Sequence, residues 1–222
     1  MLEELDKSEV LRYLGYRQNG LNERMEALIS RCVEETLRVC EGKYIYKRFP
    51  AAFTGRGVEL PGTGICLTGK DIRKHLENCR EVYLMCATAG MELDRRVRKM
   101  MISEPDAAVV MDACGIQAVE QIADQAEAQI EKTVRREGLN TTWRFSPGYG
   151  DLPLELQRDF LRVLDTHRKI GVSLTESFLM VPAKSVTAVV GVTDIRKDER
   201  KNKCDHCDNR ENCGFRKRGT IC

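Results

Sequence analysis

The chain has 222 residues, of which 42% are apolar and 32% are charged, a composition typical of one folded domain with room for a small appendage. A chain of this length can bury a substantial core, and with this composition we do not expect an intrinsically disordered protein. The 36 basic and 34 acidic residues leave a formal charge of +2, which excludes binding to nucleic acid by overall charge alone.

The first ten residues carry four acidic side chains and no apolar run, so we expect neither a signal peptide nor a transit sequence. The most apolar stretch, residues 170–195, is interrupted by charged residues and a proline. It falls short of a membrane-spanning run. We therefore expect a cytoplasmic protein that does not associate with membranes.

The N-terminal half mixes predicted helices and strands. Apolar residues recur every three and four positions over residues 21–40, the spacing of an amphipathic helix. Runs of aromatic and β-branched residues bounded by glycine and proline predict strands over residues 43–49, 57–67 and 81–87. Thr68 followed by Asp71 is a capping signature for a short helix ending at Cys79, and a further helix is predicted over residues 91–101.

The longest predicted element is a helix from Ser103, whose hydroxyl can cap it, to Arg136, with a possible break at Gly115. Its predicted buried stripe consists of Val119, Ile122, Ala123, Ala126, Ile130 and Val134. Four carboxylates with spacings of four, three and four share the adjacent face: Glu120, Asp124, Glu127 and Glu131. From the residues alone we interpret this face as solvated and partly paired with basic neighbours.

The C-terminal part of the main domain begins with a loop over residues 141–151 that is dense in proline, glycine and aromatic residues. Asp151 is predicted to cap a helix that ends at Leu164. Two strands follow, over residues 172–180 and 185–193. Strands and helices do not alternate as βαβ units, so we expect an α+β domain with a twisted, largely antiparallel sheet and flanking helices.

We divide the chain into this domain, residues 1–195, and a cysteine-rich tail, residues 196–222. The tail carries nine basic and five acidic residues and few large apolar ones, so its folding is expected to depend on a metal. Its four cysteines, with the spacing C-x2-C-x5-C-x8-C, are Cys204, Cys207, Cys213 and Cys222. Four thiolates suit zinc or an iron-sulfur cluster, and His206 can replace one of them. We favour a [4Fe-4S] cluster because only one cysteine pair is closely spaced, with zinc as the alternative.

The segment R-F-S-P-G-Y, which begins at Arg144, combines three features of a small-molecule site. An arginine fork can hold a carboxylate through two parallel hydrogen bonds. Gly148 allows a ligand to approach the main chain, and Tyr149 offers a flat stacking face. An ordinary proline-glycine turn with a surface arginine is an equally good interpretation of these residues alone.

Residues 144–192 resemble the activation domain of cobalamin-dependent methionine synthase, which binds S-adenosylmethionine. Three motifs carry the resemblance in order along the chain: R-x-x-x-G-Y from Arg144, L-T-E-S-F over residues 174–178, and A-K-S-V-T over residues 183–187. This chain looks like a free-standing version of a domain that is elsewhere fused to the rest of the synthase.

The resemblance implies cofactor contacts at four residues of the loop: Arg144, Ser146, Gly148 and Tyr149. The family's acidic residue on the long helix corresponds to Asp124, with Glu120 as the alternative. A second family glutamate upstream of the arginine has no counterpart near Thr141. A histidine-proline segment that ends in tyrosines in the family is replaced here by the cysteine tail.

The family chemistry implies a role in methionine biosynthesis as an accessory subunit of a cobalamin-dependent methyltransferase. Reduction of inactive cob(II)alamin, carried by a partner corrinoid protein, is coupled to methyl transfer from S-adenosylmethionine. No catalytic acid, base or nucleophile is assigned, because the cofactors supply the bond chemistry. A cluster in the tail would relay an electron from a donor such as flavodoxin or ferredoxin.

The competing hypothesis is a zinc-stabilised regulatory or nucleic-acid-binding module, which the basic run Arg216, Lys217 and Arg218 favours. Against it, the tail lacks a recognition-helix pattern and interleaved aromatic residues. We therefore do not expect nucleic acid as the partner.

Overall fold

A four-stranded antiparallel sheet with the order β1-β5-β9-β6 organises the chain. In the computed structural model the residues described are 2–16 and 21–195, so the predicted tail and its cysteines lie outside the described residues. The strands of this sheet are β1 (Lys43–Pro50), β5 (Cys79–Thr88), β6 (Asn140–Thr141) and β9 (Ser185–Thr193). The expected α+β domain with an antiparallel sheet is confirmed.

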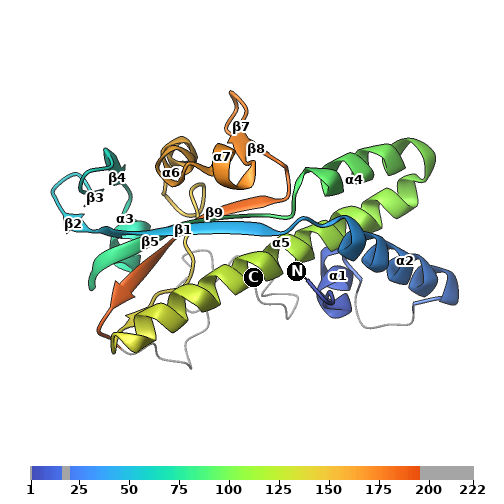
Figure 1. The fold of residues 1–222 in the computed structure, drawn as a ribbon, viewed down its shortest axis with the longest axis horizontal. Helices are drawn as coiled ribbons and strands as arrows, with labels where there is room; N and C mark the ends of the chain where they lie inside the picture. The colour runs from blue at the N-terminus through green and yellow to red at the C-terminus, as the bar shows by residue number, and fades with distance from the viewer. Residues whose placement is uncertain (1, 17–20, 196–222) are drawn as a thin grey trace.

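Helices cover both faces of this sheet (Figure 1). The 32-residue helix α5 (Pro105–Arg136) runs along one face and packs against the other helices of that side, namely α1 (Lys7–Tyr13), α2 (Glu23–Val39) and α4 (Met91–Ser103). The opposite face carries α3 (Lys70–His75), α6 (Leu156–Leu164) and α7 (Thr166–Ile170). Within the described residues, no helix is both long and apolar enough to cross a membrane.

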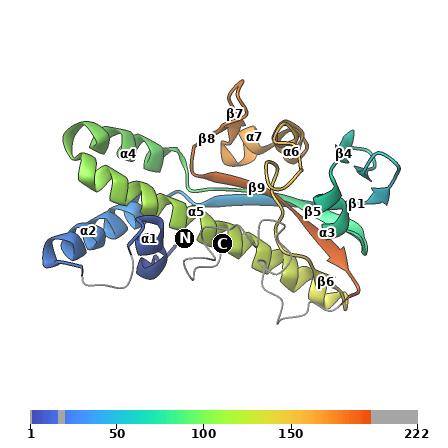
Figure 2. The same ribbon diagram turned by 180° about the vertical axis from the view of Figure 1, so that it is seen from behind.

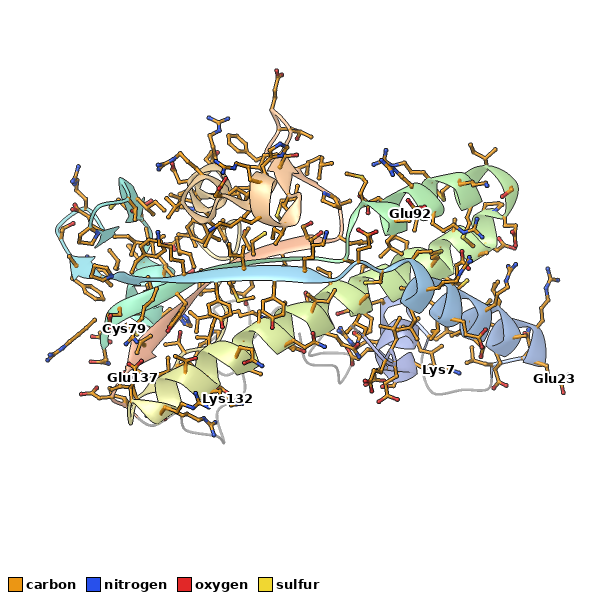
Figure 3. The ribbon with its side chains drawn as sticks, viewed as in Figure 1. Lys7, Glu23, Cys79, Glu92, Lys132 and Glu137 are labelled. Atoms are coloured by element: carbon orange, nitrogen blue, oxygen red, sulfur yellow. The ribbon has the colours of Figure 1, made fainter. Side chains whose placement is uncertain are left out.

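The central strand β5 separates two cores, and side chains fill the space on both sides of the sheet (Figure 3). Met85 and Ala87 face the α5 side, whereas Leu84 and Cys86 face the α6 side, as the period of two in a strand requires. Because both faces are buried there, residues 82–87 of the strand are a continuous apolar run rather than an alternating one.

Helix α5 is continuous, and the six residues predicted for its stripe are all buried. It has no break at Gly115, because that residue serves packing instead: a Cβ there would lie 3.0 Å from Leu93 and 3.2 Å from Lys184. The predicted cap at Ser103 is wrong. Ser103 is the last residue of α4, and its hydroxyl donates to the Lys99 carbonyl at 3.5 Å.

Two predicted strands are hairpins. Residues 57–67 form β3 (Val58–Leu60) and β4 (Ile65–Leu67), joined by a turn in which the Thr63 hydroxyl donates to the Leu60 carbonyl at 2.6 Å. Together with β2 (Ala52–Phe53) they make a three-stranded sheet. Residues 172–180 contain no continuous strand. They hold β7 (Ser173–Leu174), which pairs with β8 (Met180–Val181).

The predictions that Thr68 caps α3 and that Asp151 caps α6 are also wrong. Helix α3 follows Gly69 and ends at His75, so neither Thr68 nor Cys79 bounds it. Helix α6 begins at Leu156, with Glu155 before it and no side-chain cap. Asp151 instead caps α3, a contact between segments far apart in the sequence.

Candidate functional site

The loop between β6 and α6 crosses the edge of the sheet from the α5 side to the α6 side (Figure 2). It is tied to the central part of β9. Phe145 and Val189 exchange two main-chain hydrogen bonds of 2.8 and 2.9 Å, and the Thr142 amide donates to Gly191 at 2.9 Å. Phe145 packs into the α6-side core, so its neighbour Arg144 turns toward α5.

Arg144 lies against the acidic face of α5. Its Nη2 atom contacts Glu120 at 3.1 Å and Asp124 at 2.8 Å, and its Nε atom contacts Glu127 at 3.4 Å. The Arg144 side chain is only 11% exposed. The acidic face is thus paired with basic side chains, as expected, and three of its four carboxylates converge on one largely buried arginine, although Asp124 itself is 66% exposed.

The third nitrogen of the Arg144 guanidinium, Nη1, differs from the other two in its hydrogen bonding. Nη1 of Arg144 is buried and has no hydrogen-bond partner within the described residues. A buried charged donor without a partner is costly, so this atom fits an anionic group such as a ligand carboxylate. With one guanidinium and three carboxylates, the cluster carries a formal charge of −2. A ligand that combines a carboxylate with cationic groups therefore complements it.

The remaining loop residues predicted for the site form a tight turn. The Tyr149 amide donates to the Ser146 carbonyl at 3.0 Å, and the Gly148 amide donates to Leu152 at 2.8 Å. Gly148 has a φ of 86°, a conformation that favours glycine. The Tyr149 ring meets Phe145 edge-on at 5.3 Å and is 54% exposed, which leaves ring surface available for stacking.

A surface hollow of about 570 Å³ adjoins the acidic side of this cluster. It is lined by Leu2, Glu3, Glu4, Gln121, Asp124, Gln125 and Ala128. Asp124 therefore both contacts Arg144 and faces the hollow. The wall made by residues 2–4 was missed from the sequence, which holds no motif there; the structure shows that Leu5 and Val10 are buried and anchor this segment.

The described part of the chain holds no group of three or more histidine, cysteine, aspartate or glutamate side chains that could bind a metal. The predicted ligands Cys204, Cys207, Cys213 and Cys222 fall beyond it. Cys79, Cys86 and Cys114 are buried free thiols, and burial raises the pKa of each to about 12. They act as small apolar side chains rather than as nucleophiles or ligands.

Residues 87–201, slightly more than half of the chain, match the family described as vitamin B12 dependent methionine synthase, activation domain. The chain belongs to this family. The match confirms the resemblance inferred from the loop and strand motifs, and it spans α4, α5, the Arg144 loop and β9. Residues 1–86 of this activation-domain chain lie outside the match, and they include α1, α2 and α3.

The fold of this activation-domain chain is similar to the crystal structure of the MetH reactivation domain bound to AdoHcy. The TM-score is 0.65 at 16% sequence identity, and the similarity covers 98% of this chain and 82% of that one. At this identity the likeness establishes the fold alone. Among curated proteins, no match to the chain is found.

Proposed function

We propose that this chain binds S-adenosylmethionine at the Arg144 loop and supports the reductive methylation of a cobalamin carried by a methionine synthase or related corrinoid protein. Membership of the activation-domain family supports the role. Similarity to a domain solved with AdoHcy supports the ligand. The observation that carries the proposal is the buried Arg144 Nη1 atom, which has no partner within the described residues.

In this proposal Arg144 receives the methionyl carboxylate at Nη1, while its other nitrogens stay paired with α5. S-adenosylmethionine also carries an ammonium and a sulfonium, so its net charge of +1 complements the acidic cluster around Arg144. Asp124 is the acidic contact we favour over Glu120, because Asp124 also lines the adjoining hollow. A carboxylate at this position attracts the cationic groups of the ligand.

The loop residues would hold the rest of the ligand. Gly148 is exposed, so a ligand can reach its main chain, while Leu154 packs on the side where a Cβ would lie. Tyr149 would provide a stacking surface, and Ser146 a polar contact at the start of the turn. Bound S-adenosylmethionine supplies the methyl group and the partner's cobalamin accepts it, so this chain's residues bind and orient rather than act as acid, base or nucleophile.

The tail, residues 196–222, is proposed as a separate metal-stabilised unit next to the domain of residues 1–195. The four clustered cysteines support this, with a [4Fe-4S] cluster favoured over zinc. An iron-sulfur cluster would pass the electron needed for each reactivation from a donor such as flavodoxin or ferredoxin to the corrinoid partner. Such thiolate chemistry suits the reducing cytoplasm, where we place the protein.

Calorimetric titration with S-adenosylmethionine tests the binding site. Arg144→Ala should weaken binding about 10- to 150-fold, or roughly 1.5 to 3 kcal/mol, the range for a hydrogen-bonded charge. Arg144→Lys should also weaken binding, because it keeps the charge but loses the fork.

The matched control is Arg135→Ala. Arg135 also pairs with a carboxylate of α5, at 3.8 Å, but its side chain is 70% exposed. This control should bind like the parent. Equal affinity of the parent and the folded Arg144→Ala protein would refute the assignment of the carboxylate contact.

A further inference from the structure

Helix α3 lies outside the family match, but it contacts the Arg144 loop through both of its own ends, at residues 70–71 and at His75. At the far end of the loop, Asp151 accepts hydrogen bonds from the first two amides of α3. Its Oδ2 atom accepts from Lys70 at 2.5 Å and its Oδ1 atom accepts from Asp71 at 3.1 Å. The first amides of a helix have no partner within the helix. A carboxylate 81 positions later in the chain thus supplies the cap of α3.

Two glycines allow the loop and the helix to approach this closely. Gly69 has a φ of 132°, and a Cβ on it would collide with the Asp151 carboxylate. Gly150 has a φ of 55°, and a Cβ on it would collide with the Asp71 carboxylate. Each segment therefore has a glycine where the other presents a carboxylate, and a side chain at either position would push the two segments apart.

At the near end of the loop, His75 closes a second contact. Its Nε2 atom lies 3.0 Å from the carbonyl oxygen of Trp143. Since a carbonyl can only accept, Nε2 carries the proton and donates it. The His75 ring also packs on Trp143, with centroids 4.9 Å apart, and on Phe145 at 5.1 Å. Trp143 directly precedes Arg144, so this contact fixes the backbone from which the guanidinium extends.

From this geometry we propose that Asp151 and His75 are positioning residues that hold the loop of residues 143–151 in its ligand-binding shape, and that α3 is part of the binding apparatus. The proposal rests on the proposed function of Arg144. A loop that becomes ordered only when a ligand binds loses conformational entropy at that moment. A loop already fastened at Trp143 and Asp151 avoids that loss, so the two contacts raise affinity without touching the ligand.

The first experiment compares S-adenosylmethionine binding to the full chain with Asp151→Ala and with Gly69→Ala. The first variant removes the cap, and the second displaces it while leaving the Asp151 carboxylate chemically intact. Each should raise Kd about five- to tenfold, the equivalent of a lost helix cap. The double variant should be little weaker than either single one, because both act through one contact.

The matched control is Asn22→Ala, which removes the cap of α2, where Asn22 accepts from the Met25 amide at 2.9 Å. Asn22→Ala should lower the thermal midpoint of unfolding by about as much as Asp151→Ala does, and it should leave the Kd for S-adenosylmethionine unchanged. Loss of affinity in Asp151→Ala with parent-like binding in Gly69→Ala would overturn the proposal, because Asp151 would then act by direct contact with the ligand.

A second measurement, without ligand, separates this proposal from the proposed function. Hydrogen exchange at the amides of Gly148, Tyr149 and Leu152, which are bonded within the loop, should be faster in Asp151→Ala and Gly69→Ala than in the parent and Asn22→Ala. Unchanged exchange in both loop variants would overturn the positioning role. If the variants differ from the parent in exchange as expected but the parent binds no S-adenosylmethionine, the proposed function is refuted. The role of Asp151 in holding the loop would still stand.

His75 is tested by two substitutions. His75→Gln keeps an N–H donor for the Trp143 carbonyl, whereas His75→Phe keeps an aromatic ring and loses the donor. Slower loop exchange and tighter binding in His75→Gln than in His75→Phe would support positioning by the hydrogen bond. The reverse order would overturn that role for His75.

Discussion

The three carboxylates around Arg144 should contribute unequally to stability, in the order of their burial. The exposed fractions of their side chains are 18% for Glu127, 39% for Glu120 and 66% for Asp124. The distances to Arg144 run the other way, since Asp124 is nearest at 2.8 Å and Glu127 is farthest at 3.4 Å. Stability measurements therefore show whether burial or distance dominates in this cluster.

We expect burial to dominate. An ion pair in solvent contributes about 0 to 1 kcal/mol, because water and salt screen it. A charged partner withdrawn from water contributes more, and its removal leaves the buried guanidinium less satisfied. Glu127→Gln should therefore lower the free energy of unfolding by about 1 to 2 kcal/mol. Asp124→Asn should cost about 0.5 kcal/mol or less, partly because it relieves repulsion from Glu120, one helical turn away.

Urea unfolding of each single variant is the assay, at low salt and again at high salt. The slope of the free energy against urea should stay constant, so that midpoints report stability. Glu92→Gln is the control and should cost about 0.5 kcal/mol or less, since Glu92 pairs with Arg95 at 3.5 Å on another helix and both side chains are at least half exposed. The burial argument is refuted if Asp124→Asn costs as much as Glu127→Gln, or if high salt abolishes the cost of Glu127→Gln.

Two further predictions concern the cysteines. Burial raises the pKa of Cys79, Cys86 and Cys114 to about 12, whereas unfolded thiols ionise near 8.5. The native state binds more protons above that pH, so the contribution of these three thiols to the free energy of unfolding should be constant below about pH 8.5 and fall as pH rises toward 12. Urea midpoints that stay level between pH 8.5 and pH 10.5 would contradict this. For the tail, the purified protein should contain iron and sulfide with visible absorbance that bleaches on reduction, and a colourless protein with one equivalent of zinc would exclude the iron-sulfur assignment.

Elements with a sustained hydrophobic period could be predicted from the sequence. The stripe of α5 repeats over most of its 32 residues, so errors at single positions do not change the interpretation. Strand β9 has nine residues, most of them β-branched, and pairs with strands on both sides in the sheet. The prediction of one strand over residues 57–67 was wrong because Thr63 and the glycines on either side of it make a turn. A short run of apolar residues does not show where a chain reverses direction.

Caps were the least predictable feature, because a capping side chain does not have to act on the nearest helix. Asp151 precedes α6 in the sequence, and that proximity led to the prediction that it caps α6. The structure brings α3 to the same carboxylate from 81 positions earlier. Glycines at residues 69 and 150 make this approach possible, but in the sequence each is an ordinary turn residue.

The candidate site shows the same division between local and long-range information. Arg144, Gly148 and Tyr149 form a local motif, so they could be selected before the fold was known. The carboxylates that neutralise Arg144 could not be predicted from this motif. Arg144 reaches them on α5 because Phe145 pairs with Val189 and turns the arginine toward that helix. Carboxylates spaced four and three along a helix that packs on a sheet repel one another unless a cation approaches from the sheet. In this chain the cation comes from a loop at the sheet edge, and it keeps one nitrogen unpaired by the described residues.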